Sequence, residues 1–130
     1  MLVLSLCLFA CNAWAQSPKV ARGKYLVEEV SRCQECHSPK SVEGVFDKEK
    51  WMKGSVLLFQ PIEPIKGWHK TAPDITRAGR LWGKWGELTL VKFLTTGLGP
   101  TGKPAGAPMP IYKMSQEDAE AIVDYLKTLQ

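Results

Sequence analysis

Apolar side chains recur at helical spacing near the start of the chain. Ser17 and Pro18 suit the cap and the first turn of a helix over residues 18–32. The apolar stripe of this helix consists of Val20, Leu26, Val27 and Val30. Gly23 lies within the same segment, where a glycine lowers helix stability but leaves room for another helix to cross closely.

The last sixteen residues, 115–130, predict a second helix with clear end signals. Ser115 is a suitable cap, and Asp118 follows three residues later, close to a capping box. Met114 and Ala119 occupy the positions of a hydrophobic staple. The buried face is predicted to consist of Ile122, Tyr125, Leu126 and Leu129.

A third helix is predicted over residues 86–97, and Gly97 is a suitable C-terminal cap. Its expected inner face consists of Leu90, Phe93 and Leu94. Residues 38–80 show little helical pattern, and within them SVLLFQP predicts one short strand that ends at Pro61. Met52 has no distinctive setting in this charged stretch.

Much of the remaining chain is irregular. Residues 97–110 contain four Gly and four Pro. Three short helices bury too little surface to stabilise so much irregular chain, unless a large apolar cofactor forms the middle of the core. Because there are no repeats or linkers, we expect one domain with a cofactor at its centre.

The first fifteen residues carry no charge and end in Ala13-Trp14-Ala15, which is typical of a secretory signal peptide. Cleavage after Ala15 would leave residues 16–130 as one exported, periplasmic domain. The segment before Cys11 also resembles the cleavage motif of lipoproteins. In that alternative, a lipid on Cys11 would tether the protein to a membrane.

Positive charge is distributed unevenly. Residues 40–113 contain twelve Lys and Arg against six Asp and Glu, whereas residues 115–130 contain four acidic residues and one Lys. This pattern indicates either an ordinary solvated surface or a basic face that attracts an acidic partner. Nucleic acid is not an expected partner, because no Lys or Arg cluster alternates with aromatic residues.

The motif Cys33-Gln34-Glu35-Cys36-His37 carries the chemistry. A redox dithiol would be expected at a helix N-terminus in an alternating strand and helix pattern, which is absent. A zinc site would have to combine Cys33, Cys36 and His37 with His69. Covalent haem attachment uses both cysteines and the histidine of the motif: the two thiols add to the two vinyl groups of the haem, and the histidine binds its iron. Since the other two cysteines, Cys7 and Cys11, lie in the leader region, haem attachment is the favoured interpretation.

Over nearly the whole of residues 16–130, the sequence resembles the class I c-type cytochromes. It is most similar to the monohaem bacterial type found as domains of periplasmic dehydrogenases. The matching segments are GKYLVEEVSRCQECH, APDIT, WGKWGELTLVKFLTTG and GKPAGAPMPIYKMSQEDAEAIVDYL. The resemblance implies an all-α fold, with three main helices and long loops wrapped around one covalently bound haem c. It also implies that the first and last helices cross.

Met109 is the candidate for the second iron ligand. It lies between Pro108 and Pro110, which stiffen the loop, and in the resembled family the methionine of this segment binds the iron. Two alternatives remain open: Met109 is only a core residue, or His69 is the ligand. Ligation by His37 and Met109 would leave no open site for a substrate, which favours electron transfer over catalysis.

The residues around the haem are less specific. In related cytochromes a proline carbonyl accepts the second N–H of the ligating histidine, and Pro73 is the candidate here. Trp68, Trp82 and Trp85 are expected to form walls of the haem pocket, where an indole N–H could bind a propionate. Plain core packing is the alternative for these residues.

The expected function is therefore that of a monomeric periplasmic electron carrier, not an enzyme, whose iron cycles between Fe(III) and Fe(II). Its expected partners are a donor dehydrogenase or quinol-oxidising complex and an acceptor oxidase or reductase. One alternative is a dedicated cytochrome subunit of a periplasmic dehydrogenase complex. Another is a haem enzyme or sensor with an open iron site.

Overall fold

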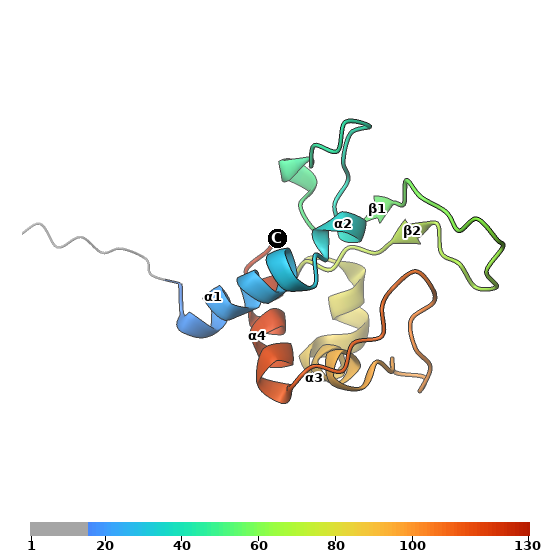
Figure 1. Ribbon diagram of the computed structural model, residues 1–130. Coiled ribbons are helices and arrows are strands. Elements are labelled where there is room, and N and C mark those ends of the chain that lie inside the picture. The colour runs from blue at the N-terminus through green and yellow to red at the C-terminus, as the bar shows by residue number, and fades with distance from the viewer. Residues whose placement is uncertain (1–15) are drawn as a thin grey trace, which may run out of the picture.

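The computed structural model describes residues 16–130 and places the first and last helices across one another (Figure 1). Helix α1 spans Pro18–Tyr25 and continues as the π-helical turn η1, Leu26–Val30, while α4 spans Gln116–Lys127. The hydroxyl of Ser17 accepts from the Val20 N–H at 3.2 Å. The hydroxyl of Ser115 accepts from the Asp118 N–H at 3.1 Å. Both predicted caps are confirmed.

Gly23 makes the crossing of α1 and α4 close. A Cβ atom at Gly23 would lie 1.9 Å from the carbonyl oxygen of Ala121, which is far inside any real contact distance. Next to this contact, Arg22 forms an ion pair with Asp118 at 3.0 Å. The crossing expected from Gly23 is therefore confirmed, and only a residue without a side chain fits there.

Helix α3, Arg80–Thr96, is longer than predicted. It begins six residues before the expected start and passes Gly86 with φ 71° and ψ 169°, a backbone conformation outside the helical region. Glycine adopts this conformation readily, so two helical segments join at a kink. The predicted end at Gly97 is confirmed, with a left-handed φ of 76°. Leu90 and Phe93 are buried as predicted.

The core lies where these helices meet. Its buried members are Leu26, Val27, Met52, Ile75, Trp82, Leu90, Val91, Ala119, Ile122, Val123, Tyr125 and Leu126. Two sequence expectations were wrong. Val30 is 55% exposed, because the wide π turn takes it off the buried stripe. Met52 is fully buried, since its N–H donates to Ser38 Oγ at 2.8 Å and a positive φ turns the chain inward.

The predicted strand is much shorter than expected. Strand β1, Ser55–Val56, pairs antiparallel with β2, Thr71–Ala72. The Leu57 N–H still donates to the Lys70 carbonyl, and the residues between them form a projecting loop (Figure 1). The short helices α2, Gln34–His37, and η2, Lys48–Lys50, complete the elements. The structure is mainly helical with long loops, as the all-α expectation required.

In residues 16–130 no helix is both long and apolar enough to cross a membrane. The predicted signal peptide and the alternative lipid site at Cys11 lie outside the described residues.

Candidate functional site

Cys33, Cys36 and His37 lie on a single helical turn. Arg32, with a left-handed φ of 49°, reverses the chain between η1 and α2. The His37 N–H then donates to the Cys33 carbonyl at 2.9 Å, which closes the turn. Because residues three and four apart share a helix face, the two sulfurs and the imidazole lie on the same side of α2.

The imidazole of His37 is held in one orientation. Its side chain is buried, with 4% of its surface exposed, and Nδ1 donates to the Pro73 carbonyl oxygen at 2.7 Å. A carbonyl can only accept, so the proton lies on Nδ1 and the lone pair lies on Nε2. Burial lowers the pKa of His37, which favours the neutral ring. The structure thus places Pro73 where the sequence analysis expected it.

The thiols lack the properties of a redox dithiol. Burial raises the pKa of Cys33 to about 11 and also raises the pKa of Cys36. Reactive dithiols instead need a lowered thiol pKa, because the thiolate is the nucleophile. Both sulfurs are unpaired in the structure, so they remain free to form bonds to another group.

The zinc alternative is not supported by the described part of the chain. Among residues 16–130, no group of three or more His, Cys, Asp and Glu side chains could hold a metal ion. His69 is exposed and lies on the loop before Pro73, whereas a structural zinc site needs four ligands at one point.

The loop that carries Met109 is attached at two points. On one side, the His69 N–H donates to the Ala107 carbonyl at 2.7 Å. On the other, the Tyr112 hydroxyl donates to the Ser31 carbonyl at 3.4 Å. Met109 lies between these contacts and is half-buried. The loop is therefore fastened to the segment before Pro73 and to the turn before Cys33.

Gly106 explains the close approach of this loop to His69. A Cβ atom on Gly106 would lie 2.3 Å from Cδ2 and Nε2 of the His69 ring. His69 therefore packs against the loop that carries Met109. Which of the two side chains binds a cofactor stays a prediction, as does the alternative that Met109 only fills space.

The three tryptophans have different environments. Trp82 is 3% exposed, and its indole N–H donates to the Ile75 carbonyl at 2.8 Å, so this N–H is not available to a propionate. Trp85 is half-buried and packs edge-to-face on Phe93 with ring centroids 5.3 Å apart. Trp68 has a buried indole N–H without a partner among the described residues. The role of these rings as pocket walls stays a prediction.

Tyr112 is the site residue that the sequence analysis missed. Burial raises the pKa of its hydroxyl to about 12, and the nearby Cys33 contributes to this shift. The ring therefore lies beside the attachment turn, although it is distant from it in sequence. The only signal in the sequence was its position as the one aromatic residue between Met109 and the last helix.

The donor set matches the requirements of haem c. Cys33 and Cys36 supply two unpaired sulfurs from one turn, and His37 supplies a buried neutral imidazole with a free Nε2. Met109 supplies a soft thioether from a loop that is fastened on both sides of this turn. The residues of the attachment turn therefore fit two thioether bonds and one iron ligand, and Met109 stays the predicted second ligand.

Comparison with known proteins finds a matching family model and several relatives. The family model described as Cytochrome c matches residues 20–130. A diheme cytochrome c-type protein of Cereibacter sphaeroides is 32% identical over 116 residues, which cover 85% of this chain and 36% of that protein. The fructose dehydrogenase cytochrome subunit of Gluconobacter japonicus is 30% identical over 115 residues, covering 83% of this chain and 21% of that subunit. The gluconate 2-dehydrogenase cytochrome c subunit of Pantoea cypripedii is 31% identical over 129 residues, covering 88% and 27%. The chain thus spans about a fifth to a third of the length of these relatives.

Proposed function

Because the chain belongs to the cytochrome c family, we propose that it is an electron carrier with one covalently bound haem c and no catalytic site of its own. When bound, haem c supplies a one-electron couple between Fe(III) and Fe(II). The protein's contribution is to hold this group, to set its axial ligands and to present it to partner proteins.

One observation carries the proposal. The loop of Met109 is hydrogen-bonded through Ala107 to His69 and through Tyr112 to Ser31, so it is fastened on both flanks of the His37 site. A loop held at two points keeps a weak thioether ligand in place at low entropic cost. Ligation of the iron by His37 and Met109 would leave no open position for a substrate, which supports electron transfer rather than substrate chemistry.

Cys33, Cys36 and His37 perform separate tasks in this proposal. The two sulfurs would hold haem c on α2 through thioether bonds. His37 donates through Nδ1 to Pro73, so its Nε2 is oriented as the other axial ligand. This hydrogen bond fixes the ring orientation and raises the basicity of the ligand.

The proposed location is the periplasm. The uncharged residues 1–15 support export, and cleavage after Ala15 would release residues 16–130 as the mature cytochrome domain. Processing before Cys11 would instead leave a lipidated N-terminus. Mass spectrometry of the exported protein decides between these two products.

Redox proteins are the proposed partners: a dehydrogenase or quinol-oxidising complex as donor, and an oxidase or reductase as acceptor. The excess of Lys and Arg over residues 40–113 supports attraction of an acidic partner surface. Such encounters are small and short-lived, so the carrier would be a monomer between them. If steering operates, the rate of reduction by a donor protein falls with ionic strength. A flat profile removes the steering part of the proposal.

A second candidate function is that of a permanent cytochrome subunit of a dehydrogenase. It is favoured by the names of two relatives, which are cytochrome subunits of fructose dehydrogenase and gluconate 2-dehydrogenase. A free carrier would purify alone, whereas a subunit would co-purify with a larger enzyme in fixed proportion.

The ligand assignment is tested first by visible spectroscopy of the haem-loaded ferric protein. We expect the weak methionine-sulfur-to-iron charge-transfer band in the near red. Met109→Ala should abolish it, whereas Met114→Leu, which changes a methionine packed on the core, should retain it. Absence of the band from the native protein would contradict ligation by Met109. Tight carbon monoxide binding by the ferrous protein would then indicate an open iron site, and its absence would point to His69.

A further inference from the structure

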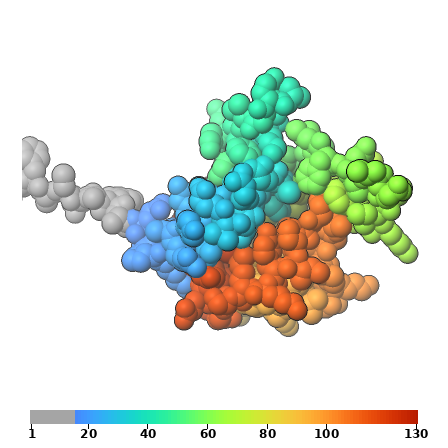
Figure 2. Space-filling view, viewed as in Figure 1, coloured from blue at the N-terminus to red at the C-terminus, as the bar shows by residue number. Residues whose placement is uncertain are grey.

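Apolar side chains project into solvent from the β1–β2 hairpin, residues 55–72. They include five of the twelve exposed large hydrophobic residues among residues 16–130, although Phe59 packs edge-to-face on Trp68 of the same hairpin. Their exposed fractions are 65% for Val56, 63% for Leu58, 49% for Phe59, 100% for Ile62 and 49% for Ile65. The hairpin, green to lime in Figures 1 and 2, extends away from the helices. Such a cluster on one projection marks an interaction surface, unlike apolar residues scattered singly.

Positive charge accompanies this apolar surface. Lys53, Lys66 and Lys70 are exposed and form no ion pair with any residue in 16–130. Glu63 is the only acidic residue between positions 53 and 70, so this stretch carries three positive charges and one negative charge, or +2. Unpaired lysines beside an apolar tip complement a surface that is apolar inside and negatively charged outside.

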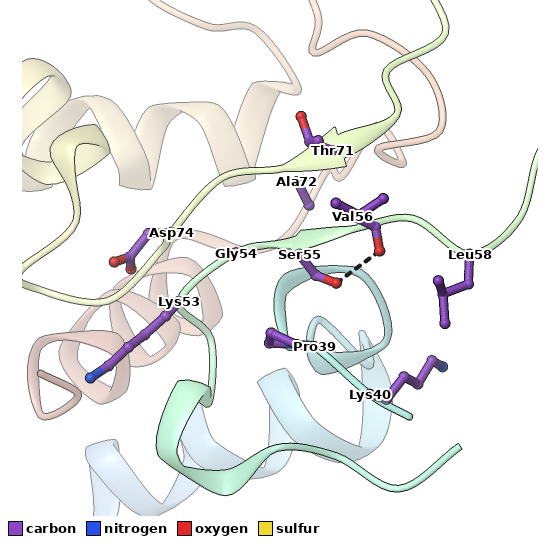
Figure 3. A pocket seen from close by; sticks show the side chains of 10 residues that line it. All are labelled: Pro39, Lys40, Lys53, Gly54, Ser55, Val56, Leu58, Thr71, Ala72 and Asp74. Atoms are coloured by element: carbon purple, nitrogen blue, oxygen red, sulfur yellow. Dashed lines mark hydrogen bonds between the residues drawn. The ribbon is translucent and has the colours of Figure 1, made fainter. Parts of the chain in front are cut away.

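The base of the hairpin also combines apolar and charged side chains. Figure 3 shows a shallow depression with Leu58 and Lys40 at one end and Lys53 and Asp74 at the other. Lys40 is engaged with Glu35 at 2.5 Å. The cations available to a partner are therefore Lys53 and the two lysines of the hairpin itself.

The backbone of the tip is suited to a medium with little water. Pro61 and Pro64 flank Ile62 and Glu63 and have no N–H group. Each backbone N–H that enters an apolar medium without a partner costs free energy. Two prolines in four residues lower that cost beside the fully exposed Ile62.

We propose that this hairpin docks on the surface of an anionic lipid bilayer. The side chains of Leu58 and Ile62 enter the boundary between head groups and acyl chains, while Lys66 and Lys70 lie among the lipid phosphates. Ile62 is fully exposed, and a fluid bilayer accepts such a side chain without a matching cavity, whereas a protein partner would need a pocket shaped to it.

The base of the hairpin connects this surface to the haem-attachment turn. Gly54 donates its N–H to the His37 carbonyl at 2.8 Å, and Pro73 accepts from the His37 ring at 2.7 Å. Docking through the hairpin therefore brings the attachment turn towards the membrane. Only this consequence depends on the proposed function: a carrier held in this way would exchange electrons with membrane-bound enzymes.

The test is co-sedimentation of the exported holoprotein with vesicles. Its mass must first show that residues 1–15 are removed and that no lipid is attached, so that neither can cause binding. We expect binding to phosphatidylcholine vesicles that contain about one third phosphatidylglycerol, and much weaker binding to pure phosphatidylcholine. Added salt should weaken the binding, because screening acts on the lysine contacts.

Matched variants separate the hairpin from the rest of the surface. Leu58→Ser with Ile62→Ser should lower the vesicle partition coefficient about tenfold or more. Val42→Ser with Leu88→Ser removes two residues that are 92% and 87% exposed elsewhere, and should leave it unchanged.

Charge variants provide a second test. Lys66→Gln with Lys70→Gln should weaken binding about thirtyfold, at roughly 1 kcal/mol per lysine near the surface. Lys84→Gln with Lys92→Gln changes the net charge equally, on α3, and should have a smaller effect. Glu63→Gln should strengthen binding, because it removes the one negative charge of the tip.

Two results would overturn the proposal. One is a wild-type protein that binds neither kind of vesicle. The exposed side chains of the hairpin would then be assigned to binding a protein partner. The other is equal loss of binding in the two serine pairs, which would show that exposed apolar area in general is responsible. The assay measures membrane binding alone, so either failure leaves the proposed electron transfer untouched.

Discussion

Nδ1 of His37 lies 2.7 Å from the carbonyl oxygen of Pro73, which is 36 residues away along the chain. This contact assigns the proton to Nδ1 and leaves the lone pair on Nε2, which the proposed ligation of iron needs. It also joins the attachment turn to the segment that leads into α3. The orientation of the proposed ligand is thus decided by a backbone atom far from the motif.

The first prediction concerns this proton. In the haem-loaded ferrous protein, we expect the Nδ1 proton of His37 to exchange slowly with water, because the side chain is 4% exposed and the proton is donated to Pro73. Nitrogen-15 NMR of labelled histidine measures the exchange. The ring of exposed His69 serves as the fast-exchanging reference. Equal rates at both rings would contradict the contact.

The second prediction concerns the helix crossing. Gly23→Ala should lower the free energy of unfolding by about 3 kcal/mol, because its Cβ would meet the Ala121 backbone, which cannot move aside. Gly83→Ala is the control within α3, where a Cβ meets nothing within 4 Å. Its higher helix propensity should raise stability by about 0.5–1 kcal/mol. Urea unfolding of both variants checks the difference, and equal effects would argue against a close crossing.

The third prediction concerns acid stability. Lys40, and to a smaller extent Arg32, lower the pKa of Glu35 below its ordinary value of 4.5. The stability from this carboxylate is complete above that ordinary value and is lost as the pH falls through the lower folded-state pKa. Glu35→Gln should therefore cost about 0.5–1 kcal/mol at neutral pH, and progressively less in acid.

Unfolding in urea at a series of pH values measures this loss. Glu49→Gln is the control, because Glu49 is exposed and forms no ion pair with any residue in 16–130. A cost of Glu35→Gln that stays constant with pH would rule out the ion pairs as its cause.

The fourth prediction concerns the loop of Met109. Tyr112→Phe removes the hydrogen bond to Ser31 and should cost about 0.5–1 kcal/mol of stability. It should also speed hydrogen exchange at the Met109 amide, which donates to the Gly106 carbonyl at 3.2 Å. Tyr25→Phe is the control, since that side chain is 52% exposed. Unchanged exchange in Tyr112→Phe would show that this bond does not fasten the loop.

Local signals in the sequence predicted much of the fold. Helix caps act on backbone groups within a few residues of themselves. The caps predicted at Ser17, Ser115 and Gly97 are therefore confirmed. Gly23 predicted a helix crossing because a missing side chain matters only where another chain comes close. The expected strand at 55–61 was too long, since its apolar residues face solvent instead of a sheet partner.

What the sequence alone determined is the chemistry of one helical turn. The spacing of Cys33, Cys36 and His37 places two sulfurs and an imidazole on one face wherever that turn forms, because helix geometry is local. The tertiary structure alone decided which distant groups surround the turn. Tyr112 reaches the turn before Cys33, which the sequence analysis missed, whereas the contact of Pro73 with the His37 ring was expected only through the family resemblance. Both contacts depend on how loops separated by tens of residues pack together. Such contacts leave no periodic pattern in the sequence, because they arise only when the whole chain has folded.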